Sequence, residues 1–312
     1  MRICKVCHDP AAIYLANYGG NLCRDHFLEV IRKKVRKTIQ KYKMINPYER
    51  VAVALSGGKD SAVLLHILDT IYTETLDLIG IHINLGIAAS DYSKTSYDLA
   101  KDLCQKLERD FNSVDLNNEY QISMDRVKNR ETRLSRPLCA VCGTVKRYLL
   151  NRYSLNLNCE KLATGHVLDD EVSVLFMNLI NGKTEQLIRT GPHLKSENSS
   201  MITRIKPLYE ISELETSAYA EFAGLETQTK DCPYSRGATT LKYKNFLQNL
   251  ETQIPGIKNT FLQNFHKRLL KPLKNYYQEP EGIIKPCKSC NGPTTGEICS
   301  FCTIKKVILQ EE

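Results

Sequence analysis

The sequence has no long hydrophobic run and therefore offers no candidate for a membrane-spanning helix. None of its apolar segments approaches the roughly 18 residues that a helix needs to cross a bilayer. The first residues, Met1–Cys4, do not begin an apolar signal segment, and no internal repeat is visible. With 312 residues, 42% hydrophobic and 25% charged, the composition is that of a globular protein with a full core. We therefore expect a cytoplasmic protein without a membrane partner.

Disulfides are also unexpected, although the chain has 12 cysteines, because cytosolic thiols are kept reduced. Short spacings indicate metal binding instead. Two sets of four ligands lie near the ends of the chain: Cys4, Cys7, Cys23 and His26, and Cys287, Cys290, Cys299 and Cys302. Ligands separated by two residues can converge on one ion at about 2.0–2.3 Å, and closed sets of four are typical of structural zinc. For the second set, a rubredoxin-like iron or an iron–sulfur site is the alternative.

Three further cysteines, Cys139, Cys142 and Cys232, have no obvious fourth partner. Three readings stay open from the residues alone. They are catalytic thiols that form a persulfide and a disulfide, ligands of a [4Fe–4S] cluster with one iron left open, or a packing pair plus a loop cysteine. Cys104 and Cys159 have the surroundings of ordinary buried thiols.

A glycine loop between a strand and a helix predicts a phosphate site. The apolar run 51–55 ends at Ser56-Gly57-Gly58-Lys59-Asp60-Ser61, and a helical pattern follows at once. Backbone N–H groups of such a loop and of the helix N-terminus point to one place, where Lys59 adds charge and the serines add hydroxyls. The spacing is not Walker A, which has four residues between its glycines. An ordinary turn is the alternative.

Strand and helix patterns alternate through the middle of the chain, which predicts an α/β fold with an open parallel sheet and flanking helices. The expected strands are 51–55, 76–83, 113–116 and 161–164, and the expected helices are 27–45, 62–68, 93–108, 142–153, 169–180, 212–223, 241–250 and 259–270. Residues 182–200 read as a loop. The expected units are a zinc finger at 1–26, a basic linker helix at 27–48, a catalytic domain at 49–272 and a second zinc finger at 273–312, entered through a linker at 272–286.

Positive charge is concentrated on the expected helix 27–45. The net charge is +8, and Arg32, Lys33, Lys34, Arg36, Lys37, Lys41 and Lys43 all lie in this segment. Such a run is usually a solvated helix face, but next to a nucleotide site it also suits contacts with a phosphate backbone.

These motifs together resemble a known family. The loop Ser56–Ser61 looks like the PP-loop of N-type ATP pyrophosphatases, which have an adenine nucleotide alpha-hydrolase-like fold and split ATP into AMP and pyrophosphate. Two zinc modules, a central Cys-x2-Cys and a later lone cysteine make the chain similar to the tRNA 2-thiolation enzymes. Residues 163–171 resemble the family's Gly-His-Asn-Leu-Asp-Asp motif, with Val167 in place of asparagine, and 82–87 match a strand end.

The resemblance implies roles for individual residues. Cys139, Cys142 and Cys232 would hold a [4Fe–4S] cluster, with Lys146 and Asp170 as catalytic residues. The matching ATP-binding positions are Ala54, Ser56, Gly57, Gly58, Lys59, Asp60, Ser61, Ile83 and Gly165. Asp170 would interact with the nucleotide or its Mg²⁺, or would transfer a proton. Spacing alone does not show which of Asp169 and Asp170 faces the site. A surface charge at Lys146 and helix capping by the aspartates are the alternatives.

The implied activity is ATP-dependent sulfur transfer to C2 of a tRNA uridine, with sulfur carried on the open iron. Composition favours the wobble uridine U34 over the T-loop U54, because many Asn, Gln and Cys residues are unlike hyperthermophile proteins. The sulfur donor would be sulfide, a persulfide or a ubiquitin-like thiocarboxylate carrier, and the family suggests a homodimer. The alternatives are tRNA modification with a nitrogen nucleophile, of the lysidine or amidation type, and a catalytically silent zinc-dependent RNA-binding protein.

Overall fold

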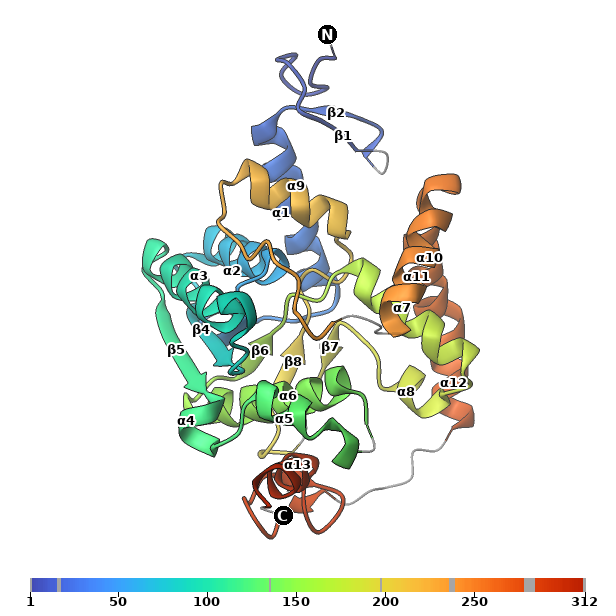
Figure 1. Cartoon of the computed structure of the whole chain (residues 1–312). Helices are drawn as coiled ribbons and strands as arrows, with labels where there is room; N and C mark the ends of the chain where they lie inside the picture. Colours follow the sequence, from blue (N-terminus) through green and yellow to red (C-terminus); the bar gives the residue numbers. More distant parts are fainter. Residues whose placement is uncertain are drawn as a thin grey trace.

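A six-stranded, mostly parallel sheet forms the centre of the molecule (Figure 1). The computed structural model describes residues 2–15, 18–134, 136–196, 198–235, 239–277 and 284–310. Across the sheet the strands are β5 (Asp110–Asp115), β4 (Asp77–Asn84), β3 (Arg50–Leu55), β6 (Lys161–Ala163), β8 (Thr203–Ile205) and β7 (His193–Leu194). All neighbouring pairs are parallel except β7 and β8. The sheet is therefore mostly parallel, which confirms the expected open parallel sheet with flanking helices, and only β7 at one edge is antiparallel to its neighbour.

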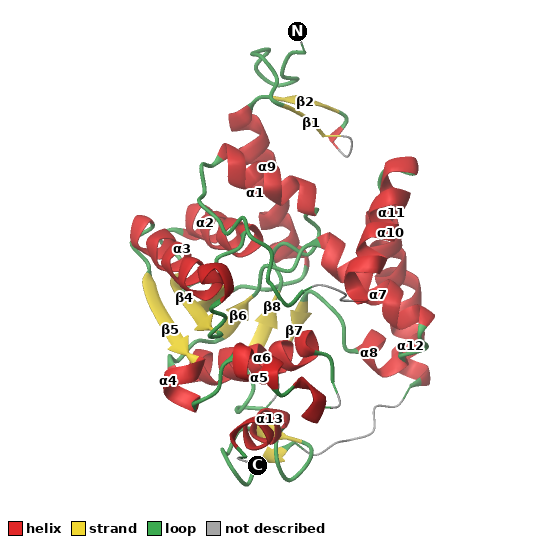
Figure 2. Cartoon of the chain, in the orientation of Figure 1, coloured by secondary structure: helices red, strands yellow, loops and turns green. Residues whose placement is uncertain are grey.

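Helices cover both faces of the sheet (Figure 2). On one face lie α1 (Arg24–Lys41), α2 (Lys59–Tyr72), α3 (Tyr92–Lys106) and α9 (Glu213–Phe222). On the other lie α4 (Leu116–Tyr120), α5 (Met124–Asn129), α6 (Leu138–Asn156) and, packed on α6, α13 (Ser300–Leu309). A third group beside the β7 edge consists of α7 (Leu168–Ile180), α8 (Thr184–Ile188), α10 (Thr239–Gln253), α11 (Ile257–Asn264), a π-helical turn η4 (Phe265–Leu269) and α12 (Leu270–Tyr276).

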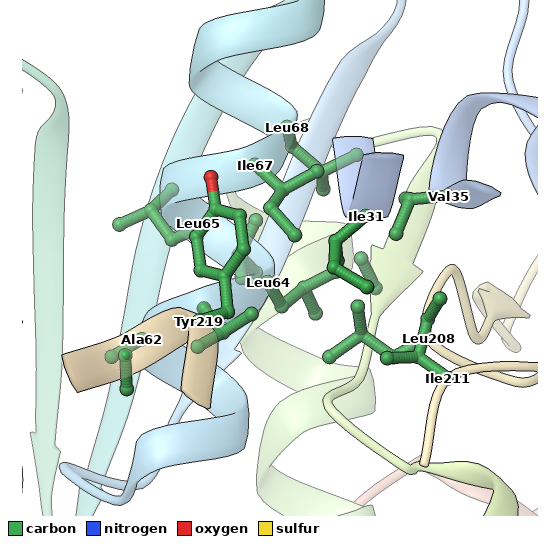
Figure 3. Close-up of a cluster of buried hydrophobic side chains, with 14 of the residues drawn as sticks. Ile31, Val35, Ala62, Leu64, Leu65, Ile67, Leu68, Leu208, Ile211 and Tyr219 are labelled. Carbon is green, nitrogen blue, oxygen red and sulfur yellow. The ribbon is translucent and has the colours of Figure 1, made fainter. Parts of the chain in front are cut away.

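The central strand β3 divides the core in two because its side chains alternate between the faces of the sheet. Val51, Val53 and Leu55 belong to the hydrophobic cluster under α1, α2 and α9, whereas Ala52 belongs to the cluster under α6. Figure 3 shows the first cluster, in which α1, α2 and α9 meet around Tyr219. Burial on both faces explains why this strand reads as a continuous apolar run.

Short elements complete the chain. They are the hairpin strands β1 (Ile13–Leu15) and β2 (Gly20–Leu22), the C-terminal strands β9 (Lys285–Pro286) and β10 (Pro293–Thr294), and the 3-10 turns η2 (Ala89–Asp91) and η3 (Glu131–Arg133). The cysteine-rich segments that contain β1–β2 and β9–β10 lie at opposite ends of the molecule in Figure 1. Within the described ranges, no helix is both long and apolar enough to cross a membrane.

Two expected boundaries were wrong. The basic helix begins at Arg24 rather than residue 27 because Cys23 is its N-cap, and it ends at Lys41 because the backbone turns at Lys43, where φ is 48°. The predicted linker from residue 272 begins inside α12. Proline lacks an N–H, so Pro272 interrupts the helical ladder without ending the helix, and the π-helical turn η4 directly precedes α12. Residues 278–283 of that linker lie outside the described residues.

The segment 182–200, expected as a loop, contains α8 and β7. Both elements are very short, and β7 pairs over two residues only, so neither produces a readable periodicity. The strand β8, with three residues, was missed for the same reason.

Candidate active site

The glycine loop lies between β3 and α2, as the sequence predicts. Gly57 has φ 79°, and a Cβ there would lie 2.7 Å from the Ser96 Cα and carbonyl oxygen, so this turn requires glycine. The Ser56 N–H donates to Ser61 Oγ at 3.1 Å, which closes the loop. A Cβ on Gly165 would lie 2.9 Å from the Ser61 nitrogen. Gly165 thus packs directly on the loop backbone although 104 residues separate them in the sequence.

Charged side chains connect the loop to α9. The Lys59 Nζ lies 3.2 Å from Asp60 Oδ1 and 3.0 Å from Glu213 Oε1. Asp60 also accepts a 2.6 Å hydrogen bond from the Thr216 hydroxyl. Burial raises the pKa of Asp60 despite Lys59, whereas the pKa of Glu213 is lowered because Lys244 and Lys59 outweigh its burial. The loop lysine is therefore paired with carboxylates beside the loop.

A cavity of about 890 Å³ opens over this loop. Of the predicted site residues, its wall includes Ala54, Ser56, Gly58, Asp60, Ser61, Lys146, Gly165 and Asp170. The other predicted ATP-site residues are not on this wall. Gly57 lies behind the loop against Ser96, the Lys59 amine is directed to Glu213, and Ile83 is buried in the core under α6.

Asp169 and Asp170 have different surroundings at the start of α7. Asp169 is buried and accepts hydrogen bonds from Lys258 Nζ at 2.5 Å and from the Glu213 N–H at 2.7 Å. Asp170 lines the cavity and pairs with Lys244 Nζ at 2.9 Å. Asp170 and Glu213 raise the pKa of Lys244 although burial opposes its charge, so this lysine stays protonated. Asp170 is therefore the aspartate that faces the site.

The three central cysteines line a second cavity, of about 200 Å³. Cys139 and Cys142 come from the first turns of α6, and Cys232 comes from the segment after α9. The rest of the wall is largely apolar and also contains Lys146. Burial raises the pKa of the Cys142 thiol, while the Lys146 charge opposes the shift. Lys146 is on the walls of both cavities, so it lies where they meet.

Both terminal cysteine sets form compact ligand groups. Within the described ranges, two sets have all their ligand atoms within 4.8 Å of one another: Cys4, Cys7, Cys23 and His26, and Cys287, Cys290, Cys299 and Cys302. Backbone N–H groups donate to the sulfurs, for example Val6 to Cys4 at 3.4 Å and Cys299 to Cys287 at 3.2 Å. Burial disfavours the thiolate, but these N–H donors bring the pKa of Cys4 and of Cys287 down to about 6. Each set can therefore hold one metal ion.

Comparison with known proteins identifies the family. The model of the ATP_bind_3 PP-loop domain matches residues 28–232. The tRNA-5-methyluridine(54) 2-sulfurtransferase of Pyrococcus horikoshii is 39% identical over 96% of this chain and 92% of its own length, and the enzyme of that name from Thermus thermophilus is 35% identical over 96% and 90%. The chain belongs to the PP-loop tRNA 2-thiolation family.

A solved family member has the same fold along the whole chain. The U34-tRNA thiolase NcsA from Methanococcus maripaludis, solved with its [4Fe–4S] cluster, is 30% identical with a TM-score of 0.81, and the match covers 100% of this chain and 98% of that one.

The donor set at the second cavity fits a cluster of this kind. Thiolates are the usual ligands of iron–sulfur clusters, and each cysteine binds a different iron, so the sulfurs need not converge on one point. The sulfurs of the three central cysteines, Cys139, Cys142 and Cys232, surround a common cavity in this way. They do not form one of the sets whose ligand atoms all lie within 4.8 Å of one another.

The basic helix α1, a candidate for phosphate contacts, directs several of its cations to partners within the chain. Lys34 pairs with Glu215 at 2.7 Å, Lys41 pairs with Glu210 at 2.5 Å, and Arg32 Nε donates to the Tyr219 hydroxyl at 3.0 Å. These contacts attach α1 to α9 and to the segment before it.

Several residues on the cavity wall were missed by sequence reasoning. They are Arg147 and Tyr148 on α6, Arg204 and Lys206 in and after β8, and Thr294, Thr295, Ser300 and Phe301 of the C-terminal module. Tyr148 and Phe301 stack with ring centroids 4.0 Å apart, so the C-terminal module forms part of this wall. The sequence contains no local signal for that contact, because the two rings are 153 residues apart.

Proposed function

We propose that this chain activates the C2 oxygen of a tRNA uridine with ATP and replaces that oxygen with sulfur. The observation that carries the proposal is the position of Lys146, whose side chain lines both the cavity over the PP-loop and the cavity with the three cysteines. An activated oxygen and an incoming sulfur atom can thus meet beside one ammonium group.

The first step forms an adenylate. The uridine C2 oxygen attacks the α-phosphorus of ATP, the bond to the β-phosphate oxygen breaks, and pyrophosphate leaves. Ser56–Ser61 would bind the pyrophosphate, with Lys59 transferred to it from Glu213, while Ala54 and Gly165 would contact the adenosine side. Asp60 and Asp170 are the carboxylates available for Mg²⁺ on this wall.

The second step exchanges oxygen for sulfur. A sulfide nucleophile adds to C2, and AMP departs with the former uridine oxygen, which leaves 2-thiouridine. Lys146 would stabilise the negative charge that develops at this centre. Cys139, Cys142 and Cys232 would hold a [4Fe–4S] cluster, which supplies an iron with an open coordination position for hydrosulfide.

The terminal sets would each hold one Zn²⁺, because four thiolate or imidazole ligands without an open position are typical of structural zinc. The sulfur donor would be sulfide or the thiocarboxylate end of a ubiquitin-like carrier. The proposed assembly is a homodimer, as the family resemblance implies.

For the target position, the identities support U54. The two relatives named for methyluridine 54 are 39% and 35% identical to this chain, and the thiolase named for U34 is 30% identical. The composition argument for U34 stays a prediction. Mass spectrometry of tRNA from a deletion strain separates the two, because the lost 2-thiouridine maps either to the T-loop or to the anticodon.

The reaction is tested with anaerobically reconstituted protein, ATP, Mg²⁺, sulfide and tRNA. We expect 2-thiouridine only when all components are present. Cys139→Ala should lose iron, acid-labile sulfide and at least about 100-fold in thiolation rate, an expected loss of transition-state stabilisation of about 2.7 kcal/mol or more. It should still bind ATP, because its thiol lies outside the nucleotide cavity.

Cys159→Ala is the matched control, since this buried thiol lies away from both cavities. Full activity in Cys139→Ala would overturn the cluster role. A nitrogen-substituted nucleoside as product, or no pyrophosphate release at all, would overturn sulfur transfer in favour of amidation chemistry or a silent RNA-binding protein.

A further inference from the structure

Among the described residues, two arginines on the wall of the larger cavity have no anionic partner. Arg147 lies on α6 directly after Lys146, and Arg204 lies on β8. Among the described residues, neither side chain makes a hydrogen bond or an ion pair. Burial, and next the charge of Arg147, lower the pKa of the Arg204 guanidinium, which places the two cations close enough to repel each other.

Three other cations near this cavity have carboxylate partners within the chain. Lys206 pairs with Glu171 at 2.7 Å, Lys59 with Glu213 at 3.0 Å, and Lys244 with Asp170 at 2.9 Å. Arg204 is half-buried and Arg147 is exposed, and a half-buried charge that faces a like charge without a counter-charge costs stability. An external anion that binds between the guanidinium groups therefore makes the arrangement favourable. Phosphate suits such a site because the guanidinium fork matches its oxygens.

The reaction itself brings two kinds of phosphate into this cavity. The phosphates of ATP would be bound by the loop Ser56–Ser61 and the N-terminus of α2. A uridine whose C2 oxygen reaches the nucleotide must leave its stack and carry its flanking backbone phosphates into the cavity. Lys146, which adjoins Arg147 in the chain, lies where both cavities meet.

We propose that Arg147 and Arg204 together bind a backbone phosphate of the RNA next to the target uridine, an assignment that rests on the proposed function. The pair would fix the depth at which the uridine enters, with the C-terminal module at Thr295 and Ser300 on the same wall. These arginines are positioning residues, since they contact the RNA backbone rather than the reacting atoms.

The test compares three double variants by fluorescence anisotropy with labelled tRNA over a range of salt concentrations. Arg147→Gln with Arg204→Gln removes the proposed site, and Arg147→Lys with Arg204→Lys keeps its charge. Lys267→Gln with Arg268→Gln removes the same charge from exposed positions of η4, which lies outside the cavity wall. Affinity for a fluorescent ATP analogue is measured in parallel.

We expect the first variant to bind tRNA about tenfold more weakly, with the slope of log Kd against log salt smaller by about 0.9, as for one lost phosphate contact. The lysine variant should recover most of the affinity, and ATP binding should stay unchanged in all three. The melting temperature of the glutamine variant should be at least that of the wild type, because two repelling charges are gone.

Unchanged tRNA affinity in the Arg147→Gln, Arg204→Gln variant would overturn the assignment, and so would an equal loss in the η4 variant, which would indicate a general charge effect. A loss of ATP affinity or of carrier-protein binding without a loss of tRNA affinity would place a different anion between the arginines. The proposed function fails separately: wild-type protein would then make no 2-thiouridine, whether or not its tRNA binding depends on the two arginines.

Discussion

At the scale of single residues, two neighbouring aspartates illustrate how position on a helix decides a role. Successive helical residues point about 100° apart, so Asp169 turns into the protein while Asp170 turns toward the cavity. Asp169 is 3% exposed and its partner Lys258 is 4% exposed. This buried pair joins α7 to α11, and the Glu213 N–H adds a contact from α9.

Asp169→Asn should therefore destabilise the fold, because it leaves the Lys258 ammonium buried without a counter-charge. We expect the free energy of unfolding to fall by about 3 kcal/mol. Asp170→Asn should change it by less than about 1 kcal/mol, since the pair with Lys244 is partly exposed, but should reduce pyrophosphate release at least about tenfold. Urea unfolding and a pyrophosphate assay check both, and the reverse pattern would assign the catalytic role to Asp169.

At the scale of elements, aromatic contacts of Phe301 help to attach the C-terminal module to the catalytic domain. Phe301, at the start of α13, is 2% exposed and stacks on Tyr148 of α6 with an interplanar angle of 6°. Tyr120 meets the same ring edge-on. Cys299 and Cys302 flank Phe301 in sequence, so the metal set orders the turn that presents this ring.

Phe301→Ala should weaken the docking of the module while leaving its metal in place, because no metal ligand is changed. We expect a loss of about 3 kcal/mol in the free energy of docking, seen as faster hydrogen exchange across Ser300–Leu309. Zinc content by mass spectrometry should equal that of the wild type. Phe246→Ala on α10 is the control, since this ring is 53% exposed and its exchange pattern should not change.

The sequence was sufficient for elements whose signal is local. The loop at Ser56–Ser61 and both terminal ligand sets follow from residues a few positions apart, and the structure contains all three arrangements. The thiol cavity has one distant member, Cys232, which the sequence marks as a candidate but cannot place beside Cys139 and Cys142. The stacking of Tyr148 on Phe301, and the arginine pair, arise from tertiary packing between remote segments and leave no periodicity in the sequence.

At the scale of the whole molecule, buried histidines link stability to pH. Burial is the main cause that lowers the pKa of three of them, the half-buried His66 and His266 and the fully buried His82. His82, on β4, lies in the core, where its Nδ1–H donates to the Leu55 carbonyl at 2.9 Å and its Nε2 has no partner among the described residues. A second proton would have to be buried there without compensation.

Stability should therefore fall as the pH drops below about 6.5, where the unfolded chain takes up protons that the folded chain rejects. Above that pH both states are neutral at these sites, and no such dependence is expected. Each histidine adds up to about 1.4 kcal/mol per pH unit to the slope between its unfolded and its folded pKa. His82→Gln should reduce the slope between pH 6 and pH 5 by up to that amount. Urea unfolding with zinc in excess measures it, and an unchanged slope would mean that His82 is protonated in the fold.

Lys146, where the two cavities meet, affects which small molecules can move from one cavity to the other. A molecule that moves from the cavity with the three cysteines into the cavity over the PP-loop passes the Lys146 ammonium group, which attracts anions and repels cations at close range. The junction of the two cavities is therefore selective for charge. In the proposed reaction, the ammonium group would favour hydrosulfide over a neutral thiol of similar size. It would disfavour free amines, which are cationic at neutral pH and would compete as nucleophiles for the uridine.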